Sequence, residues 1–348
     1  MKYGENARMK LASYYDGSRD GQLVLVSRDL TQAHFVSHLV NRLQSVLDDW
    51  NYLAPQLQDL SDALNAGRAR HPFPFDPQAC MAPLPRSNEW VMAYGYASHW
   101  SVLRRAAGDS AEPPRHSAVL EQGSGGHFGG AHRPLAYPEQ QLPDFEAQVA
   151  VVTGDVAQGS SPERCIESVR LLVLCNAVHL RALKGPQARP LTAFSPVAVT
   201  PDELGDAWHH GRLHLPLLCN WNGRKVGMCD AGSDMTWHFG HLVSQLAATR
   251  PLHAGAVVGG GPVSCPGVEK RGQKSWPSGY SCIAEKRAME QLQAGPEGQA
   301  VTGYLKEGDS IRIEMKNAAG HSVFGAIAQD VGMPDLPTNR GPTATQMS

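Results

Sequence analysis

Two polar side chains, Glu146 and Gln148, stand in the otherwise apolar stretch from Phe145 to Val152, which reads FEAQVAVV. This pattern is typical of a strand that is half exposed at one end and buried on both faces at the other. Because side chains alternate along a strand, Glu146 and Gln148 share one face. A buried polar group without a partner costs free energy. The pair therefore marks either the wet face of an edge strand or the polar face of a catalytic or metal-binding site.

The composition excludes several classes of protein. A chain of 348 residues with 42% hydrophobic content is long enough for one large domain plus a small one, or for two. A formal net charge of −2 argues against nucleic acid as the main partner. Neither a long apolar span nor a signal-peptide pattern is present, so we expect no membrane partner and a cytoplasmic location. The seven cysteines form no CxxC pair, which favours a reduced protein without disulfides.

The N-terminal part of the chain predicts a small domain of its own. Residues 9–28 alternate around a DGSRDG turn and predict a β-hairpin, and residues 30–65 carry helical stripes of leucine and valine. The proline-rich segment 71–77 (HPFPFDP) then stops any helix. We expect an N-terminal extension at 1–8, a small α+β domain at 9–78, a larger domain at 79–332 and a disordered tail at 333–348.

The larger domain should be rich in short strands and turns, because glycine and proline are frequent. We predict a helix at 162–182, whose tail also reads as a strand, and another helix that begins at Thr200 and Pro201. Further predictions are a strand at 191–200, a hairpin at 213–229 around Asn222-Gly223, a helix at 233–249 capped by Ser233, strands at 256–260 and 280–283, and a strand at 310–315 that pairs with 322–326.

A glycine-rich tract, GSGGHFGG, occupies residues 123–130. It predicts either a flexible loop or a backbone that approaches a ligand closely. It is not a phosphate-binding loop, because the GK[ST] ending that such a loop needs does not follow.

Several segments together resemble the fumarylacetoacetate hydrolase family, in the family's order and over about residues 9 to 330. They are FDPQACMAPLPR (75–86), DFEAQVAVVTGDV (144–156), LTAFSPVAVTPDELGDAW (191–208), TRPLHAGAVVGGGPVS (249–264), GYSCIAEKR (279–287) and GDSIRIEM (308–315). The resemblance implies an α+β, β-rich fold with a small N-terminal α+β domain and a catalytic domain of mixed β-roll type. It also implies a homodimer and chemistry on 1,3-dicarbonyl or acylpyruvate-like small molecules, with a divalent metal that stabilises an enolate.

At the metal-ligand positions that the resemblance implies, this chain departs from the family. The family has two Glu in the opening strand, where this chain has Glu146 and Gln148. An Asp before the Phe of the glycine tract is His127 here, and an Asp after the Asn of the LCN segment is Ala177. Three of the four carboxylate positions are therefore lost.

Positions that support the site also differ. The Lys expected before the TAFSP strand is Arg189, and the Thr before Val-Ser in the glycine strand is Pro262, whereas the Glu of GYSCIAE is kept as Glu285.

These departures predict that no Mg²⁺ or Ca²⁺ is bound tightly, because hard cations need several charged oxygens. We expect no cofactor. The alternatives are a divalent metal whose ligands are aligned differently, or a softer ion such as Zn or Fe held by His127 and Glu146.

The remaining side chains still predict a reactive pocket. The candidate catalytic residues are His127, Glu146, Arg189, His132 and Glu285, and the candidate substrate-binding residues are Gln148, Phe128, Gly129 and Pro262. Arg189 would orient a carboxylate or polarise an enolate, and the two histidines would transfer protons. Glu146 and Glu285 would act as bases or orient a histidine. Each histidine could instead be an ordinary surface residue, and we interpret His179 and His238 as structural or surface residues.

The first functional hypothesis is a metal-independent, repurposed enzyme of this family, with specialised metabolism as its expected setting. It would act on an enolisable 1,3-dicarbonyl or acyl-enol substrate as a carbon–carbon hydrolase or lyase, or as a tautomerase or cyclase. The second is a conventional Mg- or Ca-dependent hydrolase of the family. The third is a non-catalytic binding or scaffold homologue that keeps the pocket and the dimer.

Overall fold

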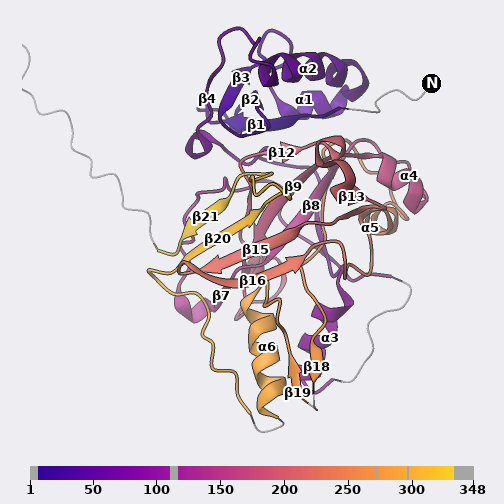
Figure 1. Cartoon of the computed structure of the whole chain (residues 1–348). Helices are drawn as coiled ribbons and strands as arrows, with labels where there is room; N and C mark the ends of the chain where they lie inside the picture. The colour runs from indigo at the N-terminus through magenta and orange to yellow at the C-terminus, as the bar shows by residue number, and fades with distance from the viewer. Residues whose placement is uncertain (1–6, 110–116, 271–272, 296–297, 333–348) are drawn as a thin grey trace, which may run out of the picture.

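The computed structural model describes residues 7–109, 117–270, 273–295 and 298–332. Most of the expected N-terminal extension and the whole expected tail at 333–348 lie outside these residues. The described part contains the predicted hairpin, with β1 (Lys10–Tyr14) antiparallel to β2 (Gln22–Val26). Helices α1 (Leu43–Asp48) and α2 (Trp50–Asn65) belong to the same N-terminal part of the molecule (Figure 1), and α1 also contacts the larger domain through the hydrogen bond from Gln44 to the Ala254 carbonyl.

The helical prediction for 30–65 is wrong at its start. Residues Gln32–Phe35 form β3, which pairs with β2 and then with the short strand β4 (Phe73–Pro74) from the proline-rich segment. The backbone of β2 needs hydrogen-bond partners on its outer edge, and β3 supplies them. The helical stripe therefore begins only at Leu43.

One eleven-stranded sheet runs through both parts of the chain, in the order β4-β3-β2-β1-β12-β9-β8-β17-β5-β6, with β11 also paired to β9. The strands not yet placed are β12 (Ala198–Val199), β9 (Val169–Ala177), β8 (Ala147–Thr153), β17 (Val257–Gly259), β5 (Trp90–Ala93), β6 (Leu120–Gln122) and β11 (Thr192–Phe194). Strand β8 lies between β9 and β17 and is buried along its whole length. The edge-strand interpretation of residues 145–152 is therefore wrong.

The sheet separates two hydrophobic cores. Val149 and Val151 of β8 face the core that contains β15 and β20, whereas Ala150 and Val152 face the core beneath the N-terminal helices. The same alternation places Gln148 on the side of Ala150 and Val152. Burial of each large aliphatic side chain contributes about 1.5–3 kcal/mol, so β8 is fixed from both sides.

A second, four-stranded sheet has the order β16-β15-β20-β21. Its strands are β15 (Pro216–Trp221), β16 (Arg224–Asp230), β20 (Ser310–Met315) and β21 (Ile327–Asp330). The predicted hairpin is confirmed, because Asn222 and Gly223 join β15 and β16 with φ values of 52° and 72°. The predicted partner of β20 is wrong. Segment 322–326 makes one isolated bridge through Ser322, and β21 pairs with β20.

Three helix predictions need correction. Helix α4 covers only Pro162–Glu167, and the continuously apolar tail forms β9. Helix α5 (Phe239–Leu246) begins after His238, because Ser233 is engaged in a turn with Asp230. The helix predicted from Thr200 and Pro201 is the 3₁₀-helix η4 (Pro201–Ala207). One strand prediction is also wrong, because residues 280–283 form no strand and lead into α6 (Ile283–Ala294).

The remaining elements are short. They are α3 (Ala97–Ala106), the strand pairs β7 (Pro143–Asp144) with β10 (His179–Leu180), β13 (Trp208–His209) with β14 (Arg212–Leu213) and β18 (Val268–Lys270) with β19 (Gln273–Ser275), and the 3₁₀-helices η1 (Pro77–Ala79), η2 (Glu139–Gln141) and η3 (Gly185–Ala188). The predicted α+β, β-rich class with a small N-terminal domain is confirmed.

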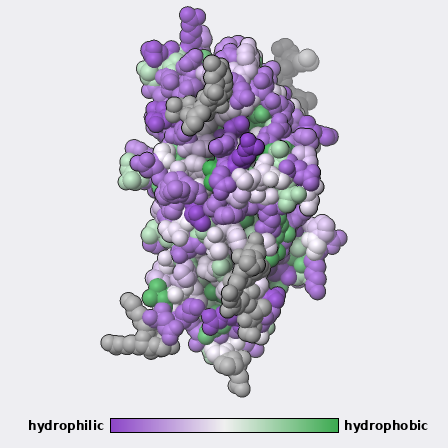
Figure 2. All heavy atoms as spheres, turned by 90° about the vertical axis from the view of Figure 1, so that its right-hand side faces the viewer, coloured by the Kyte–Doolittle hydropathy of each residue, from purple (hydrophilic) through white to green (hydrophobic). Residues whose placement is uncertain are grey.

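The surface is mostly polar on the face in Figure 2, where hydrophobic residues are scattered rather than gathered in one patch. Within the described residues, no helix is both long enough and apolar enough to cross a membrane. The seven cysteines are free thiols.

The glycine tract at 123–130 is held by its neighbours. The Gly123 N–H donates to the Trp90 carbonyl at 2.9 Å, and the Gly125 carbonyl accepts from the Ser87 N–H at 2.8 Å. A Cβ atom at Gly123 would lie only 2.1 Å from Cδ1 of Trp90. The close approach that Gly123 allows is therefore to the Trp90 indole. The contact of the tract with a ligand stays a prediction.

This packing predicts that Gly123→Ala destabilises the fold. The new methyl group must displace the Trp90 ring, which should lower the free energy of unfolding by about 1–3 kcal/mol. Gly126→Ala is the matched control, because a Cβ there meets no atom within 4 Å, and its effect should stay within about 0.5 kcal/mol. Chemical denaturation measures both. Equal effects of the two substitutions would contradict the close packing at Gly123.

Candidate active site

The Glu146 carboxylate is buried and surrounded by four hydrogen-bond donors. Arg189 Nη1 lies 2.5 Å from Oε2, and Arg181 Nη2 lies 2.7 Å from Oε1. His179 Nδ1 is 3.2 Å from Oε1, and the Gln148 side-chain amide donates to Oε2 at 3.3 Å. Each carboxylate oxygen thus has two partners, and the side chain is only 2% exposed. The predicted pairing of Glu146 with Gln148 on one face is present.

The charges around Glu146 keep it ionised. Burial alone would raise the pKa of Glu146, but Arg189 and Arg181 outweigh it and hold that pKa well below its usual range. A carboxylate with so low a pKa binds a proton too weakly to act as a general base near neutral pH. Its contacts fit an orienting role instead.

The two arginines extend the network in opposite directions. Arg181 also donates to Asp144 at 2.8 and 3.0 Å. Asp144 in turn accepts the backbone N–H groups of Ile283 and Ala284 at the start of α6, at 2.6 and 2.9 Å. This carboxylate therefore fixes both Arg181 and the beginning of α6.

Arg189, which directly follows η3, reaches the edge of the large sheet. Its Nη2 lies 3.1 Å from Oε2 of Glu121 on β6, and the Tyr94 hydroxyl donates to Oε1 of Glu121 at 3.0 Å. Charges alternate along the whole series, which we call the ion-pair chain: Asp144, Arg181, Glu146, Arg189 and Glu121.

His179 is the histidine that the ion-pair chain holds. A carboxylate can only accept hydrogen bonds, so Nδ1 of His179 carries the proton directed at Glu146 and Nε2 keeps a lone pair. Burial, followed by the opposing effects of Glu146 and the arginines, leaves the pKa of His179 lowered from 6.5. The ring is therefore neutral at pH 7. Its side chain is 17% exposed, so His179 is not fully buried.

A second histidine–glutamate pair lies on the other side of Tyr94. His99 Nδ1 is 3.3 Å from Glu285, and the Ser264 hydroxyl donates to Glu285 at 2.5 Å. The His99 ring stacks on Tyr94, with centroids 5.9 Å apart and planes at 22°. His99 is only 2% exposed. Cys282 completes a buried group with His99 and Glu285 whose potential metal-ligand atoms lie within 4.8 Å of one another.

The structure does not bring the two glycine-tract histidines to Glu146. His127 is exposed and accepts a hydrogen bond from Arg133 of the same loop, while burial and the Arg133 charge lower the pKa of His127. His132 lies near Ala328 of β21, and its Nε2 is buried without a partner. In the described part of the chain, no contact connects either ring with the Glu146 carboxylate.

Three predicted substrate-binding residues are buried in the packing. Phe128 contacts Phe194 and Trp90 edge-on, with ring centroids 4.8 and 6.0 Å apart. Gly129 forms backbone hydrogen bonds with Thr192 and Phe194 of β11. Pro262 is buried next to Gly261, whose N–H donates to Oε1 of Gln148 at 3.1 Å. The fourth residue, Gln148, therefore has both ends of its amide engaged.

Sequence reasoning missed Asp144, His179 and Arg181 as members of the site. Strands β7 and β10 pair His179 with Asp144, so the acids of Asp-Phe-Glu and the bases of His-Leu-Arg project on matching faces. The two-residue spacing in both segments was the available signal. Tyr94, His99, Glu121 and Ser264 gave no such signal, because only the fold brings them together.

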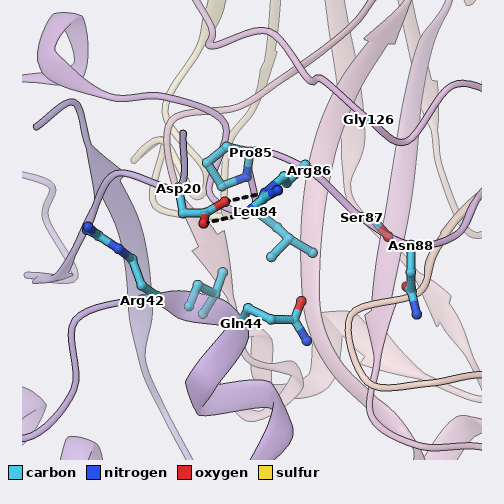
Figure 3. Close-up of a pocket in the computed structure, with 10 residues that line it drawn as sticks. Asp20, Arg42, Gln44, Leu84, Pro85, Arg86, Ser87, Asn88 and Gly126 are labelled. Carbon is cyan, nitrogen blue, oxygen red and sulfur yellow. Dashed lines mark hydrogen bonds and ion pairs between the residues drawn. The ribbon is translucent and has the colours of Figure 1, made fainter. Parts of the chain in front are cut away.

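A separate cavity of about 410 Å³ lies where the N-terminal domain meets the larger domain (Figure 3). The ion pair between Asp20 and Arg86 spans its upper side, with N–O distances of 2.7 and 2.8 Å. Gln44 lies on its lower side and Asn88 at the right in this view, and Gly126 of the glycine tract borders it. No residue of the ion-pair chain lines this cavity.

Comparison with known families identifies the class of this protein. The family model described as "Fumarylacetoacetase N-terminal domain 2" matches residues 9–86, and the one described as "Fumarylacetoacetate (FAA) hydrolase C-terminal" matches residues 89–332. The chain belongs to the fumarylacetoacetate hydrolase family and is an enzyme of that superfamily. No curated protein matches its sequence significantly.

Solved structures share the fold at low sequence identity. A fumarylacetoacetate hydrolase from the psychrophile Exiguobacterium antarcticum has a TM-score of 0.63 and 17% identity, and covers 94% of this chain and 100% of its own. Maleylpyruvate hydrolase from Sphingobium sp. SYK-6 has a TM-score of 0.62 and 15% identity, with 94% and 100% coverage. A second structure of that hydrolase contains manganese(II) and pyruvate, with a TM-score of 0.61, 15% identity and 93% and 99% coverage.

The residues at the implied metal positions do not fit a hard divalent cation. Ala177 donates its N–H to the Glu146 carbonyl at 3.0 Å, so it lies beside Glu146 but offers only a methyl group. Gln148 contributes an amide, and the Glu146 oxygens already face two guanidinium groups. A cation there would meet too few oxygens and two positive charges. The softer site of His127 with Glu146 does not fit either, because His127 is exposed and held by Arg133.

This geometry predicts a large stability loss for Glu146→Gln. The neutral amide leaves two buried guanidinium groups without their shared carboxylate, and the loss of one partner from a buried ion pair costs about 3–5 kcal/mol. Lys286→Gln is the control, because Lys286 and Glu290 form a helix-surface pair at 3.2 Å worth about 0.3–0.5 kcal/mol. Urea denaturation at pH 7 compares the two variants. A Glu146→Gln effect no larger than the control would contradict the assigned network.

The same network sets a pH dependence of stability. The folded-state pKa of Glu146 is below the unfolded value of 4.5, so its stabilisation is present above pH 4.5 and is lost as pH falls through the folded-state pKa. In denaturation curves at stepped pH, Glu146→Gln should lack this part of the acid destabilisation. Identical pH dependence in both proteins would contradict the depressed pKa of Glu146.

Proposed function

We propose that this protein is a metal-independent enzyme of the fumarylacetoacetate hydrolase family that acts on an enolisable 1,3-dicarbonyl or acyl-enol substrate. The observation that supports this most is the clamp on Glu146, where guanidinium groups take the place that the family resemblance gives to a cation. A fixed guanidinium can stabilise an enolate by charge and hydrogen bonds. Arginine side chains would then supply the positive charge that enolate chemistry in this family needs.

His179 is the proton-transfer group in this proposal. Its neutral Nε2 removes a proton from the acidic carbon between two carbonyls, or from the water that attacks one of them. The resulting imidazolium is paired with Glu146 through Nδ1. Glu146 thus selects the tautomer and stabilises the charged ring without accepting a proton itself.

Arg189 is the enolate-stabilising group. In carbon–carbon hydrolysis, water adds to one carbonyl, the carbon–carbon bond breaks, and its electron pair becomes an enolate that takes a proton to give the ketone. In tautomerisation, the proton leaves one carbon and returns at another site. Both routes pass through an enolate, so both need the positive charge that Arg189 provides beside Glu146.

The second histidine–glutamate pair has a supporting role in this proposal. His99 is 2% exposed, whereas His179 is 17% exposed. Only a ring that a small molecule can reach serves as the direct base, which favours His179. Glu285 contacts both His99 and Ser264, and the His99 ring stacks on Tyr94, so this pair would hold Tyr94 in place.

The family neighbours support a substrate with a 2-oxo acid group. One neighbour is named as a maleylpyruvate hydrolase and another as a 5-carboxymethyl-2-hydroxymuconate delta-isomerase. We propose acylpyruvates as the first substrates to assay for both hydrolysis and isomerisation. The homodimer, the cytoplasmic location and a place in specialised metabolism stay predictions.

The first kinetic prediction concerns His179. His179→Gln should lower kcat/KM for an acylpyruvate about 10²–10⁴-fold, the usual contribution of a general base. His253→Gln is the control and should keep wild-type activity. The His253 side chain is 78% exposed, and the acid that it pairs with, Asp155, is not a member of the ion-pair chain. Steady-state assays after chelator treatment measure both. Wild-type turnover by His179→Gln would remove its assigned role.

The second kinetic prediction concerns pH. Because the pKa of His179 is lowered from 6.5, the active neutral ring persists below that pH. The acid limb of the kcat/KM profile should therefore lie below pH 6.5, and kcat/KM should decrease as pH falls through the lowered pKa of His179. An acid limb above pH 7 would contradict His179 as the base.

A further inference from the structure

The carboxylate of Glu121 occupies a recognition site built by other parts of the chain. Arg189 Nη2 bonds one of its oxygens at 3.1 Å, and the Tyr94 hydroxyl bonds the other at 3.0 Å. The donors come from two separate segments, and together they engage both oxygens of a single carboxylate. This is the arrangement with which proteins bind the carboxylate of a ligand.

The two donors are held in place without Glu121. Arg189 is 10% exposed, and its other nitrogen is fixed by Glu146 at 2.5 Å. Tyr94 is half-buried and stacked on His99. Burial and the neighbouring carboxylates raise the pKa of the Tyr94 phenol, so its hydroxyl remains a donor. A binding site whose groups are already fixed loses little entropy when a ligand enters.

Glu121, by contrast, is the exposed member of the ion-pair chain. Its side chain is 39% exposed. It lies on β6, a three-residue strand at the end of the large sheet, and among the described residues this strand pairs with β5 alone. An edge strand is bonded on one side only, so a small shift there breaks few hydrogen bonds.

The charges favour replacement of Glu121 by another anion. Within the ion-pair chain, the buried acids Asp144 and Glu146 balance the buried bases Arg181 and Arg189. Glu121 is the additional negative charge, at the exposed end. An incoming carboxylate would take its place without any change in the charge of the site.

We propose that Arg189 and Tyr94 form a carboxylate-binding subsite for a 2-oxo acid or its enol, and that Glu121 fills this subsite until the ligand displaces it. The inference rests on the proposed function, because it places the substrate carboxylate on the arginine that also bonds Glu146 and, through it, His179. Glu121 then acts as an internal competitor that sets the affinity for anionic ligands.

Calorimetric titration with pyruvate tests this directly. Glu121→Ala should bind pyruvate at least tenfold more tightly than the wild type. The further change Tyr94→Phe in that background should remove most of the gain, because it deletes one of the two donors. Pyruvamide, the neutral analogue, should show no gain in Glu121→Ala. Glu139→Ala removes an exposed acid on η2 and should bind pyruvate as the wild type does.

Equal pyruvate affinity in the wild type and Glu121→Ala, or an equal gain for pyruvamide, would overturn the subsite. These titrations need no turnover, so they separate the two proposals. If the pyruvate gain appears while His179→Gln keeps full activity, the subsite stands and the proposed chemistry fails. If the gain is missing while His179→Gln is inactive, the subsite alone fails.

Discussion

A carboxylate buried in the middle of a protein must be neutralised, and the site of this enzyme follows from how Glu146 meets that requirement. A metal ion would be one solution. Here two arginines provide it, and each of them needs a further acid, which extends the network to Asp144 and Glu121. The ion-pair chain then fixes His179 beside Glu146. A change at one member leaves an unpaired charge at the next, so the network acts as a unit.

The large sheet provides the rigidity that this network needs. Strand β8 lies between two hydrophobic cores, and its neighbour β9 leads directly into β10, which carries His179. The pairing of β10 with β7 then aligns His179 with Asp144. Small displacements of these short strands would alter several hydrogen bonds together. The positions of the site residues therefore depend on the hydrophobic side chains that are buried on both faces of β8.

Much of the fold followed from the sequence, because strand alternation and turn residues are local signals. The hairpins β1–β2 and β15–β16 are of this kind, and so is the position of strand β8, although its burial at both ends was not predicted. Errors arose where a continuous run of apolar residues fits both a helix and a strand, as in β9. They also arose where a side chain expected to cap a helix forms a hydrogen bond in a turn, as Ser233 does with Asp230. For the site, Glu146, Gln148 and Arg189 do lie together, whereas His127 and His132 do not. The contact of His179 with Glu146 was not predicted, because the two residues belong to segments that only the fold brings together.

We propose that guanidinium groups, rather than a divalent cation, neutralise Glu146. Manganese(II) titration followed by electron paramagnetic resonance tests it most directly, since free and protein-bound manganese give different signals. The purified wild-type protein should leave equimolar manganese free. The triple variant Gln148→Glu, Ala177→Asp, Arg189→Lys, which supplies the missing carboxylates and removes one guanidinium, should bind it. Stoichiometric binding by the wild type that Glu146→Gln abolishes would contradict the account.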